Sequence, residues 1–360
     1  MATLPKMTKV LSVVGARPQF VKLAPIAEAF RRAGFAHATV HTGQHYDHDM
    51  SAVFFDELGI EEPEWNLGVG SGSHGSQTGA MLSALDDLFT QEEPDWVLVY
   101  GDTNSTVAAT LAAVKLHFPV AHLEAGLRSF NRKMPEEHNR VLTDHAADLL
   151  LAPTQNAAEI LAKEGLGERT VVVGDVMIDV LLDVERSLSG TVLPPHVKVK
   201  NGQDYVVATI HRAENTDDPD RLRSVIAALA ALSLPVVFPV HPRVRDRAAK
   251  ASISLDQGSL IPVEPFTYRQ MVAAVRSARS VVTDSGGLQK EAVVLGVPVT
   301  TLRTETEWVE TIVGGWNILA PSLENLNEIV MRPKPAPFGG SPYGTGHAAQ
   351  AVVAALIQRT

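Results

Sequence analysis

Three carboxylates in the first half of the sequence have the residue type and the positions for general acid–base chemistry. Asp102 and Glu124 each come just after a short apolar run, and Glu136 lies in the expected first turn of a helix. Acids also favour turns and helix N-termini for purely structural reasons. Acids at separate corners of one sheet edge, however, can flank a substrate on two faces, which proton removal and delivery require.

The second half contains a pattern suited to binding a phosphate group. The run Asp284-Ser285-Gly286-Gly287 follows an expected strand and opens an expected helix. Backbone N–H groups and the positive end of the helix dipole would then face an anion. An ordinary helix start explains the same residues equally well, because Ser285 is a common N-cap residue. Both interpretations stay open on this motif alone.

Two histidines end other expected strands of the same half. His211 is followed by Arg212, and His241 is followed closely by Arg243. This arrangement could clamp a diphosphate between guanidinium groups. A single histidine at a strand end is more often only structural, so the pair matters more than either residue.

The sequence predicts no cofactor and no metal. Gly15-Ala16-Arg17-Pro18 forms a corner like that of a phosphate loop, but it is not the Gly-x-Gly-x-x-Gly fingerprint of a dinucleotide site. A cluster of histidines and aspartates lacks the helical His-Glu-x-x-His spacing of a zinc site. Its members are His41, His45, Asp47, His48 and Asp49. The chain contains no Cys, which excludes disulfides, Cys-based zinc sites and thiol nucleophiles.

The elements that must position these residues alternate between short apolar β-branched runs and helical stretches. This pattern predicts an α/β fold with doubly wound parallel sheets. The expected strands are 10–14, 38–41, 96–99, 120–122, 149–151, 171–173, 205–210, 236–240, 280–283 and 299–302. Polar residues and glycines follow these strands in both halves, and ligands bind beyond the carboxyl ends of such strands, which predicts a central cleft between two domains.

The length of 360 residues also predicts two domains. We expect the first over residues 1–186, a Pro- and Gly-containing linker near 187–202, and a second domain over 198–346. The acid–base carboxylates fall in the first domain and the phosphate pattern in the second. A last helix in 347–360 is expected to pack back on the first domain.

Composition and charge narrow the class of protein further. The chain has 31 Lys and Arg against 41 Asp and Glu, a formal charge of −10, which disfavours nucleic acid and anionic membrane surfaces as partners. Its longest apolar stretch, 225–240, is interrupted by Ser233 and Pro235 and is shorter than the roughly 18 residues of a membrane span. The lack of Cys fits a reducing compartment, and we expect a cytoplasmic protein.

An ordered set of motifs resembles that of the non-hydrolysing UDP-N-acetylglucosamine 2-epimerases. No single motif is decisive, but together they span about residues 10 to 320 in the right order. The motifs are Gly15-x-Arg17-Pro18, Thr42-Gly43-Gln44-His45, Gly101-Asp102-Thr103, Glu124-Ala125-Gly126-Leu127-Arg128, Pro135-Glu136-Glu137-x-Asn139-Arg140, His211-Arg212-x-Glu214-Asn215, and Asp284-Ser285-Gly286-Gly287 with Glu291.

The resemblance implies a fold, a reaction and an assembly. The fold is glycosyltransferase-B-like, with two Rossmann-like domains, and the assembly is a homodimer. The reaction is the reversible epimerisation at carbon 2 of UDP-N-acetylglucosamine to UDP-N-acetylmannosamine, which supplies precursors of cell-surface polysaccharides. A base removes the carbon 2 proton as UDP leaves, giving 2-acetamidoglucal; UDP then returns and a proton arrives on the opposite face. Cationic and N–H contacts would stabilise the charge that develops on the leaving UDP.

By the same resemblance, the site residues fall into three groups. The catalytic group would be Asp102, Glu124, Glu136 and His211, with His211 also reaching the diphosphate. The UDP and substrate group would be Arg17, Arg140, Ser285, Gly286, Gly287 and Glu291, with Glu291 on the ribose hydroxyls. A second UDP-sugar could bind as an activator at Gln44, His45, His241 and Arg243.

Departures from the family pattern leave the exact substrate open. Ala16 and Gln19 stand where the family often has Thr and Glu, and Met134 stands where an aromatic residue is common. One alternative is 2-epimerisation of a related UDP-sugar such as UDP-diacetamido-glucuronic acid. A retaining UDP-sugar glycosyltransferase would share the fold, but it would need an acceptor cleft and often a basic membrane-docking face. A non-catalytic nucleotide-sugar sensor would not require all three carboxylates.

Overall fold

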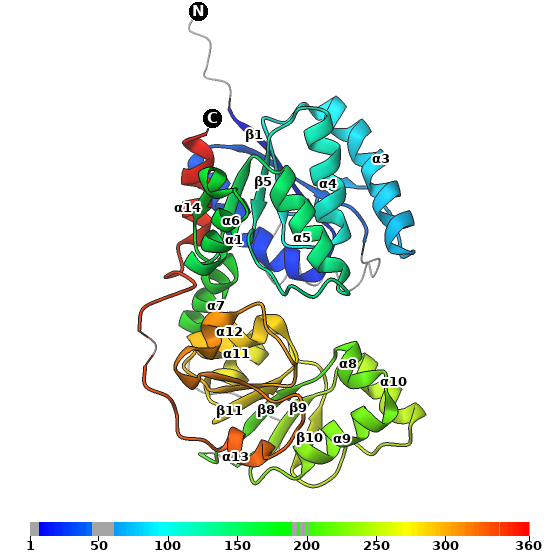
Figure 1. Ribbon diagram of the computed structural model, residues 1–360, viewed down its shortest axis with the longest axis vertical. Coiled ribbons are helices and arrows are strands. Elements are labelled where there is room, and N and C mark those ends of the chain that lie inside the picture. Colours follow the sequence, from blue (N-terminus) through cyan, green and yellow to red (C-terminus); the bar gives the residue numbers. More distant parts are fainter. Residues whose placement is uncertain are drawn as a thin grey trace, which may run out of the picture. The chain divides into compact units, whose positions relative to one another are not determined.

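The computed structural model describes residues 7–44, 61–188, 202–337 and 339–359, together with 193, 194, 197, 199 and 200. These residues form two compact units (Figure 1). One unit runs up to Val180 and resumes at Ser341, and the other covers Leu181–Gly340. Much of the predicted linker, including residues 189–192, lies outside the described part.

The first unit contains a parallel sheet of seven strands in the order β3-β2-β1-β4-β5-β6-β7. Its strands are β1 (Lys9–Val14), β2 (Ala36–His41), β3 (Trp65–Asn66), β4 (Trp96–Tyr100), β5 (Val120–Leu123), β6 (Leu149–Ala152) and β7 (Thr170–Val172). The strand order reverses between β1 and β4, and ligands of such sheets bind beyond the carboxyl ends of strands at this switch point. The corners after β1, β4 and β5 are therefore the place to look for a site.

Helices cover both faces of this sheet, which explains why its strands β4 and β6 are apolar and buried along their whole length. The helices are α1 (Arg17–Ala33), α3 (His74–Glu92), α4 (Asn104–Lys115), α5 (Pro135–Ala146), α6 (Gln155–Lys163), the 3₁₀ turn Gly167–Arg169, the start of α7 (Val176–Ser187), and α14 (Ala348–Ile357). Val10 and Val14 belong to one core with α1 and α14, whereas Leu11 and Val13 belong to the other with α3 and α4.

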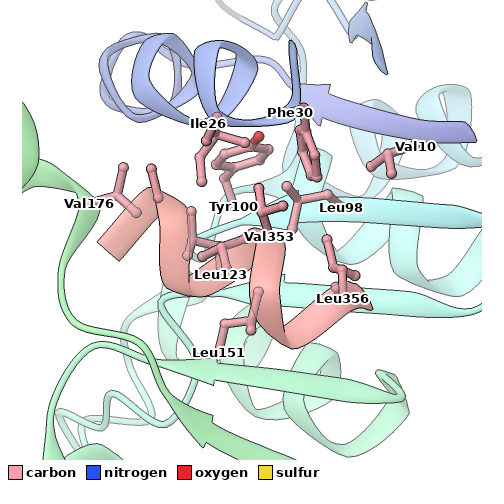
Figure 2. Packing of buried hydrophobic residues seen from close by; sticks show 14 of the residues in the cluster. Val10, Ile26, Phe30, Leu98, Tyr100, Leu123, Leu151, Val176, Val353 and Leu356 are labelled. Atoms are coloured by element: carbon pink, nitrogen blue, oxygen red, sulfur yellow. The ribbon is translucent and has the colours of Figure 1, made fainter. Parts of the chain in front are cut away.

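The last helix completes the first unit rather than the second. Figure 2 shows Val353 and Leu356 of α14 packed among Leu98, Leu123 and Leu151 of the sheet. Asp179 on α7 accepts hydrogen bonds from the first two backbone N–H groups of α14, at 3.0 and 2.8 Å. An acid at this end of a helix satisfies N–H groups that have no partner within the helix.

The second unit contains a parallel sheet of six strands in the order β10-β9-β8-β11-β12-β13. The strands are β8 (Val206–Thr209), β9 (Val236–Pro239), β10 (Leu260–Val263), β11 (Ser280–Thr283), β12 (Val299–Thr301) and β13 (Asn317–Leu319). Its helices are α8 (Ala213–Thr216), α9 (Pro219–Ala230), α10 (Pro242–Lys250), α11 (Tyr268–Arg276), α12 (Gly286–Val294), the 3₁₀ segment Val309–Gly315, and α13 (Leu326–Val330). The switch point lies between β8 and β11, where His211 and Asp284 follow.

The predicted fold class is confirmed, and every expected strand has a counterpart. The structure adds β3, β10 and β13, which the sequence did not predict. All three are edge strands of their sheets. β3 and β13 have only two and three residues, and Pro262 lies within β10, so none of the three forms a continuous strand pattern in the sequence. Among the described residues, none of the helices is both long and apolar enough to span a bilayer.

Candidate functional site

Asp102 and Glu124 lie at neighbouring corners of the first sheet. They follow β4 and β5, which pair in parallel with Tyr100 opposite Leu123. The glycine between β4 and Asp102 is required here. Gly101 has φ of +62°, and a Cβ on it would lie 3.3 Å from Glu124 Oε2. The close approach of the two corners therefore depends on a residue without a side chain.

A lysine that the sequence analysis missed forms an ion pair with Glu124. Lys22 extends from α1, and its side chain is only 10% exposed, against 14% for that of Glu124. Burial alone would lower the pKa of the Lys22 ammonium, but Glu124, and beyond it Asp175 and Asp102, outweigh this and raise it. Lys22 stands within the apolar run 20–26, and a cation in such a run was the signal available in the sequence.

Two residues of helix α5 hold Asp102 in place. Arg140 forms an ion pair with the Asp102 carboxylate, and Asn139 Nδ2 donates to the Asp102 carbonyl at 3.0 Å. The same guanidinium donates to Glu137 Oε2 at 3.0 Å. Arg140, expected among the UDP and substrate residues, thus has its buried side chain directed at two carboxylates of the protein. Glu136 lies in the first turn of the same helix and is partly exposed.

The turn that carries Glu124 has a strained backbone. Glu124 has φ of +74°, a left-handed conformation that costs a residue with a side chain about 1–2 kcal/mol. The N–H groups of Glu124 and Ala125 both donate to the Leu151 carbonyl, at 3.1 and 3.2 Å. Gly126 follows with φ of +84°, and a Cβ on it would lie 2.5 Å from the Ala157 carbonyl oxygen. Contacts with β6 and α6 therefore fix the direction of Glu124.

In the second unit, one buried aspartate joins the two corners at the switch point. Asp284 has no exposed surface, and its carboxylate accepts from the backbone N–H of His211 at 3.1 Å and of Arg212 at 3.0 Å. Asn215 Nδ2 donates to it at 3.1 Å, and His211 Nδ1 lies 3.2 Å away. Burial alone would raise the pKa of Asp284, but the contact with His211 and these donors hold it below its usual value. Asp284 thereby fixes His211 beside the start of α12.

The start of α12 is open rather than closed by a side chain. Ser285 is the N-cap residue by position, yet its side chain makes no capping hydrogen bond. A Cβ on Gly287 would meet nothing within 4 Å, and one on Gly286 would meet only atoms at 3.8 Å or beyond. Backbone N–H groups at an open helix N-terminus can bind an anion. Further along α12, the buried Glu291 accepts a hydrogen bond from the Tyr268 hydroxyl at 3.3 Å.

A buried ion pair beside Gly286 was also missed by the sequence analysis. Arg303 donates to both carboxylate oxygens of Glu307, at 2.9 and 2.8 Å. Burial alone would raise the pKa of Glu307, but Arg303 lowers it to about 2. Glu307 Oε2 and the indole nitrogen of Trp308 are among the atoms nearest to Gly286. Lys290 lies over the Trp308 ring, 3.8 Å from its centroid. In the sequence, this ion pair is indicated by opposite charges four residues apart, at Arg303 and Glu307.

The residues expected to bind an activator lie in different units. In the first unit, Gln44 Oε1 accepts from the hydroxyl and the N–H of Ser105, at 2.7 and 3.1 Å. In the second, His241 is the N-cap of α10, and its ring lies 5.5 Å from that of His211. Arg243 donates to the Thr216 hydroxyl at 2.9 Å. Its guanidinium also forms an ion pair with Asp217.

Some expected site residues fall outside the described part of the chain. His45 is one of them, as are Asp47, His48 and Asp49 of the histidine and aspartate cluster. Arg17 begins α1 directly after the corner of β1, but its side chain also lies outside the description. Of the cluster, His41 is described: its ring stacks on Phe20 with centroids 5.1 Å apart.

Comparisons with known proteins point to one family. A family model described as UDP-N-acetylglucosamine 2-epimerase matches residues 28–357. A UDP-N-acetylglucosamine 2-epimerase homolog of Methanococcus maripaludis is 47% identical over 89% of this chain and 92% of its own length. The UDP-2,3-diacetamido-2,3-dideoxy-D-glucuronate 2-epimerase of Pseudomonas aeruginosa is 44% identical, over 88% of this chain and 90% of that protein.

A solved structure extends the similarity to three dimensions. The UDP-N-acetylglucosamine 2-epimerase of Methanocaldococcus jannaschii, in complex with UDP-N-acetylglucosamine and UDP, superposes with a TM-score of 0.84 at 35% identity. The match covers 98% of this chain and all of that one. With two parallel-sheet domains, the ordered motifs and these relatives in agreement, the chain belongs to the UDP-N-acetylglucosamine 2-epimerase family and is an isomerase.

Proposed function

We propose that the protein interconverts UDP-N-acetylglucosamine and UDP-N-acetylmannosamine by eliminating UDP and adding it back. The observation that supports this most is the pair of carboxylates at neighbouring strand ends, Asp102 and Glu124, each fixed by a cation of its own unit. Two carboxylates held by different cations suit a reaction that needs proton transfer on two faces of a carbon. The relative from M. jannaschii holds UDP-N-acetylglucosamine and UDP.

The chemistry divides into two half-reactions. A carboxylate takes the carbon 2 proton, the electrons of that C–H bond form a double bond between carbons 1 and 2, and the carbon 1–oxygen bond breaks with its electrons leaving on UDP. In the second half, the diphosphate oxygen attacks carbon 1 and an acid delivers a proton to the other face of carbon 2. We assign the proton transfers to Asp102, Glu124 and Glu136, and the positioning of Asp102 to Arg140.

The second unit would bind the leaving group. The open N–H groups at Gly286 and Gly287 and the hydroxyl of Ser285 would hold a diphosphate, and His211, fixed by Asp284, would reach the same group. Preorganised donors of this kind stabilise charge that develops during the reaction. Arg17 would add a cation, and Glu291 with Tyr268 would bind the ribose hydroxyls. This division predicts that UDP affinity and proton transfer respond to different mutations.

The family resemblance extends the proposal to the cellular setting. We propose a homodimer that works in the cytoplasm without a cofactor and supplies precursors of a cell-surface polysaccharide. A second UDP-sugar at Gln44, His45, His241 and Arg243 would act as an activator. Light scattering coupled to size-exclusion chromatography tests the dimer. A lag in the reaction of UDP-N-acetylmannosamine, removed by traces of the other epimer, tests the activator.

A second substrate is favoured by one observation. A relative that acts on UDP-2,3-diacetamido-2,3-dideoxy-D-glucuronate is 44% identical to this chain. The discriminating experiment offers each UDP-sugar separately, with a chelator and without nicotinamide, and compares kcat/KM for formation of the 2-epimer. We expect UDP-N-acetylglucosamine to be converted. No conversion of it, with turnover of the glucuronate, would assign the second substrate, and no conversion of either would contradict the proposal. Asp102→Asn serves as the inactive control.

A further inference from the structure

A buried histidine connects the turn that carries Asp102 with the turn that carries Glu124. His122 lies on β5, and its side chain has no exposed surface. Its Nδ1 is 2.7 Å from Asp144 Oδ1, and its Nε2 is 2.7 Å from the carbonyl oxygen of Gly101. Gly101 directly precedes Asp102, so the ring contacts the backbone of that turn.

Both partners of the ring can only accept hydrogen bonds. The Gly101 carbonyl has no hydrogen to donate. Asp144 is ionised, because its other oxygen pairs with the Arg128 guanidinium and accepts the backbone N–H of Gly126. A ring that makes both bonds therefore carries a hydrogen on each nitrogen, and with it a positive charge. Hydrogen bonds from such a cation are shorter and stronger than neutral ones.

Asp144 carries the connection to the second turn. Its Oδ2 accepts from the backbone N–H of Gly126 at 3.1 Å and from Arg128 Nη1 at 2.6 Å. Arg128 in turn pairs with Glu164 at 2.9 and 2.7 Å. With His122 charged, the network contains two cations and two anions, so its charges balance; Glu164 at its outer end is 26% exposed. Gly126 lies two residues after Glu124, so the network is hydrogen-bonded to the backbone of both turns, at Gly101 and at Gly126.

We propose that His122 is a positioning residue for epimerisation, held as an imidazolium between Asp144 and Gly101 so that the turns of Asp102 and Glu124 keep a fixed separation. The proposal rests on the proposed function, which assigns proton transfer to these two carboxylates. Glu124 has a left-handed backbone at φ of +74°, and such a conformation in a residue with a side chain persists only where neighbouring groups determine it. Displacing a catalytic group by about 1 Å can cost about 100-fold in rate.

The kinetic test uses His122→Gln, which cannot donate to both acceptors at once. We expect kcat to fall about 30- to 100-fold through misplacement of Asp102. KM and the affinity for UDP should change by less than about threefold, since UDP is assigned to the second unit. His37→Gln is the matched control: it is the same substitution at a partly buried histidine of the first unit, whose ring is hydrogen-bonded to Ser12 of β1. Its kcat should stay that of the wild type.

A double mutant distinguishes positioning from a general loss of stability. In an Asp102→Asn background, His122→Gln should lower the remaining rate by less than about threefold, because both changes act on the same step. A full multiplicative loss in the double mutant would overturn the proposal. So would a kcat for His122→Gln that matches the His37→Gln control.

The protonation state of the His122 ring can be measured on the wild-type protein, so this test does not depend on the folding of a variant. In a ¹⁵N NMR spectrum at neutral pH, the His122 ring should show hydrogens on both nitrogens, where exposed histidines are mostly neutral. A neutral His122 ring would overturn the proposal whatever the kinetics show. If the wild type epimerises neither UDP-sugar, the proposed function is wrong and the kinetic test no longer applies. The NMR spectrum then still shows whether the His122 ring is charged.

Discussion

Removing the Lys22 ammonium should destabilise the first unit by leaving Glu124 without its cation. The side chains of Lys22 and Glu124 are 10% and 14% exposed. Deleting one partner of a buried ion pair costs about 3–5 kcal/mol, because the other charge stays buried. The residual exposure of Glu124 places Lys22→Met near the lower end, at about 3 kcal/mol. Methionine keeps most of the length of the side chain, so lost packing contributes little.

The expected change is large enough for a melting experiment. For a unit of this size, about 1 kcal/mol shifts Tm by about 2–4 °C, so Lys22→Met should melt about 6–12 °C below the wild type. Lys22→Met/Glu124→Gln should regain most of this loss, which gives a coupling energy of about 2 kcal/mol in a double-mutant cycle. Scanning calorimetry of the four proteins measures all of these quantities.

Lys9→Met supplies the matched control. Lys9 pairs with Glu92 at 2.7 Å in the same unit, but its side chain is 30% exposed and that of Glu92 is 26% exposed. More exposed pairs contribute about 0–1 kcal/mol, so Lys9→Met should shift Tm by no more than about 4 °C. The reasoning is refuted if Lys22→Met has the same Tm as Lys9→Met, or if the coupling energy between Lys22 and Glu124 is below about 0.5 kcal/mol.

Three further predictions follow from individual groups. Burial lowers the pKa of His37 to about 4, so as the pH falls the unfolded chain takes up a proton at this histidine before the folded chain does. The free energy of unfolding should therefore decrease as the pH drops from about 6.5 toward 4, by about 2 kcal/mol at pH 5. Denaturant titrations at several pH values should show a flatter pH profile for His37→Gln than for the wild type. His211→Ala and Ser285→Ala should each weaken UDP binding by about 1.5–3 kcal/mol in calorimetry, and unchanged binding in both would move the diphosphate elsewhere. Substituting each acid–base carboxylate by its amide should lower turnover by about 100- to 10,000-fold while UDP still binds, and near-normal turnover in all variants would remove these groups from the mechanism. These variants are Asp102→Asn, Glu124→Gln and Glu136→Gln.

The sequence predicted the parts of the fold that depend on fully buried segments. Continuous apolar strands such as β4 in the first sheet and β9 in the second identified the two parallel sheets, and residues directly after such strands must gather at one sheet edge. This placed Asp102, Glu124 and His211 correctly at strand ends. The strands β3 and β13 have only two and three residues, and Pro262 interrupts β10, so the sequence contains no continuous strand signal for them.

Side-chain partners could not be predicted because they depend on tertiary contacts between distant segments. Lys22 and Glu124 lie 102 residues apart, and the bond from His122 to Asp144 crosses from β5 to α5. Arg140 was expected at the UDP and substrate site, and only the structure shows the two carboxylates that it faces. Ser285 shows the opposite case: its position predicts a cap, yet its side chain makes no capping hydrogen bond.

The elimination mechanism is tested most directly by the hydrogen at carbon 2. Purified protein is incubated with UDP-N-acetylglucosamine in heavy water, without added nicotinamide and with a chelator, and carbon 2 of both epimers is followed by NMR. Asp102→Asn, incubated in parallel, controls for exchange that the enzyme does not catalyse. The account predicts one solvent deuteron at carbon 2 in UDP-N-acetylmannosamine and in the recovered UDP-N-acetylglucosamine. Epimerisation with the original hydrogen fully retained at carbon 2 would contradict it.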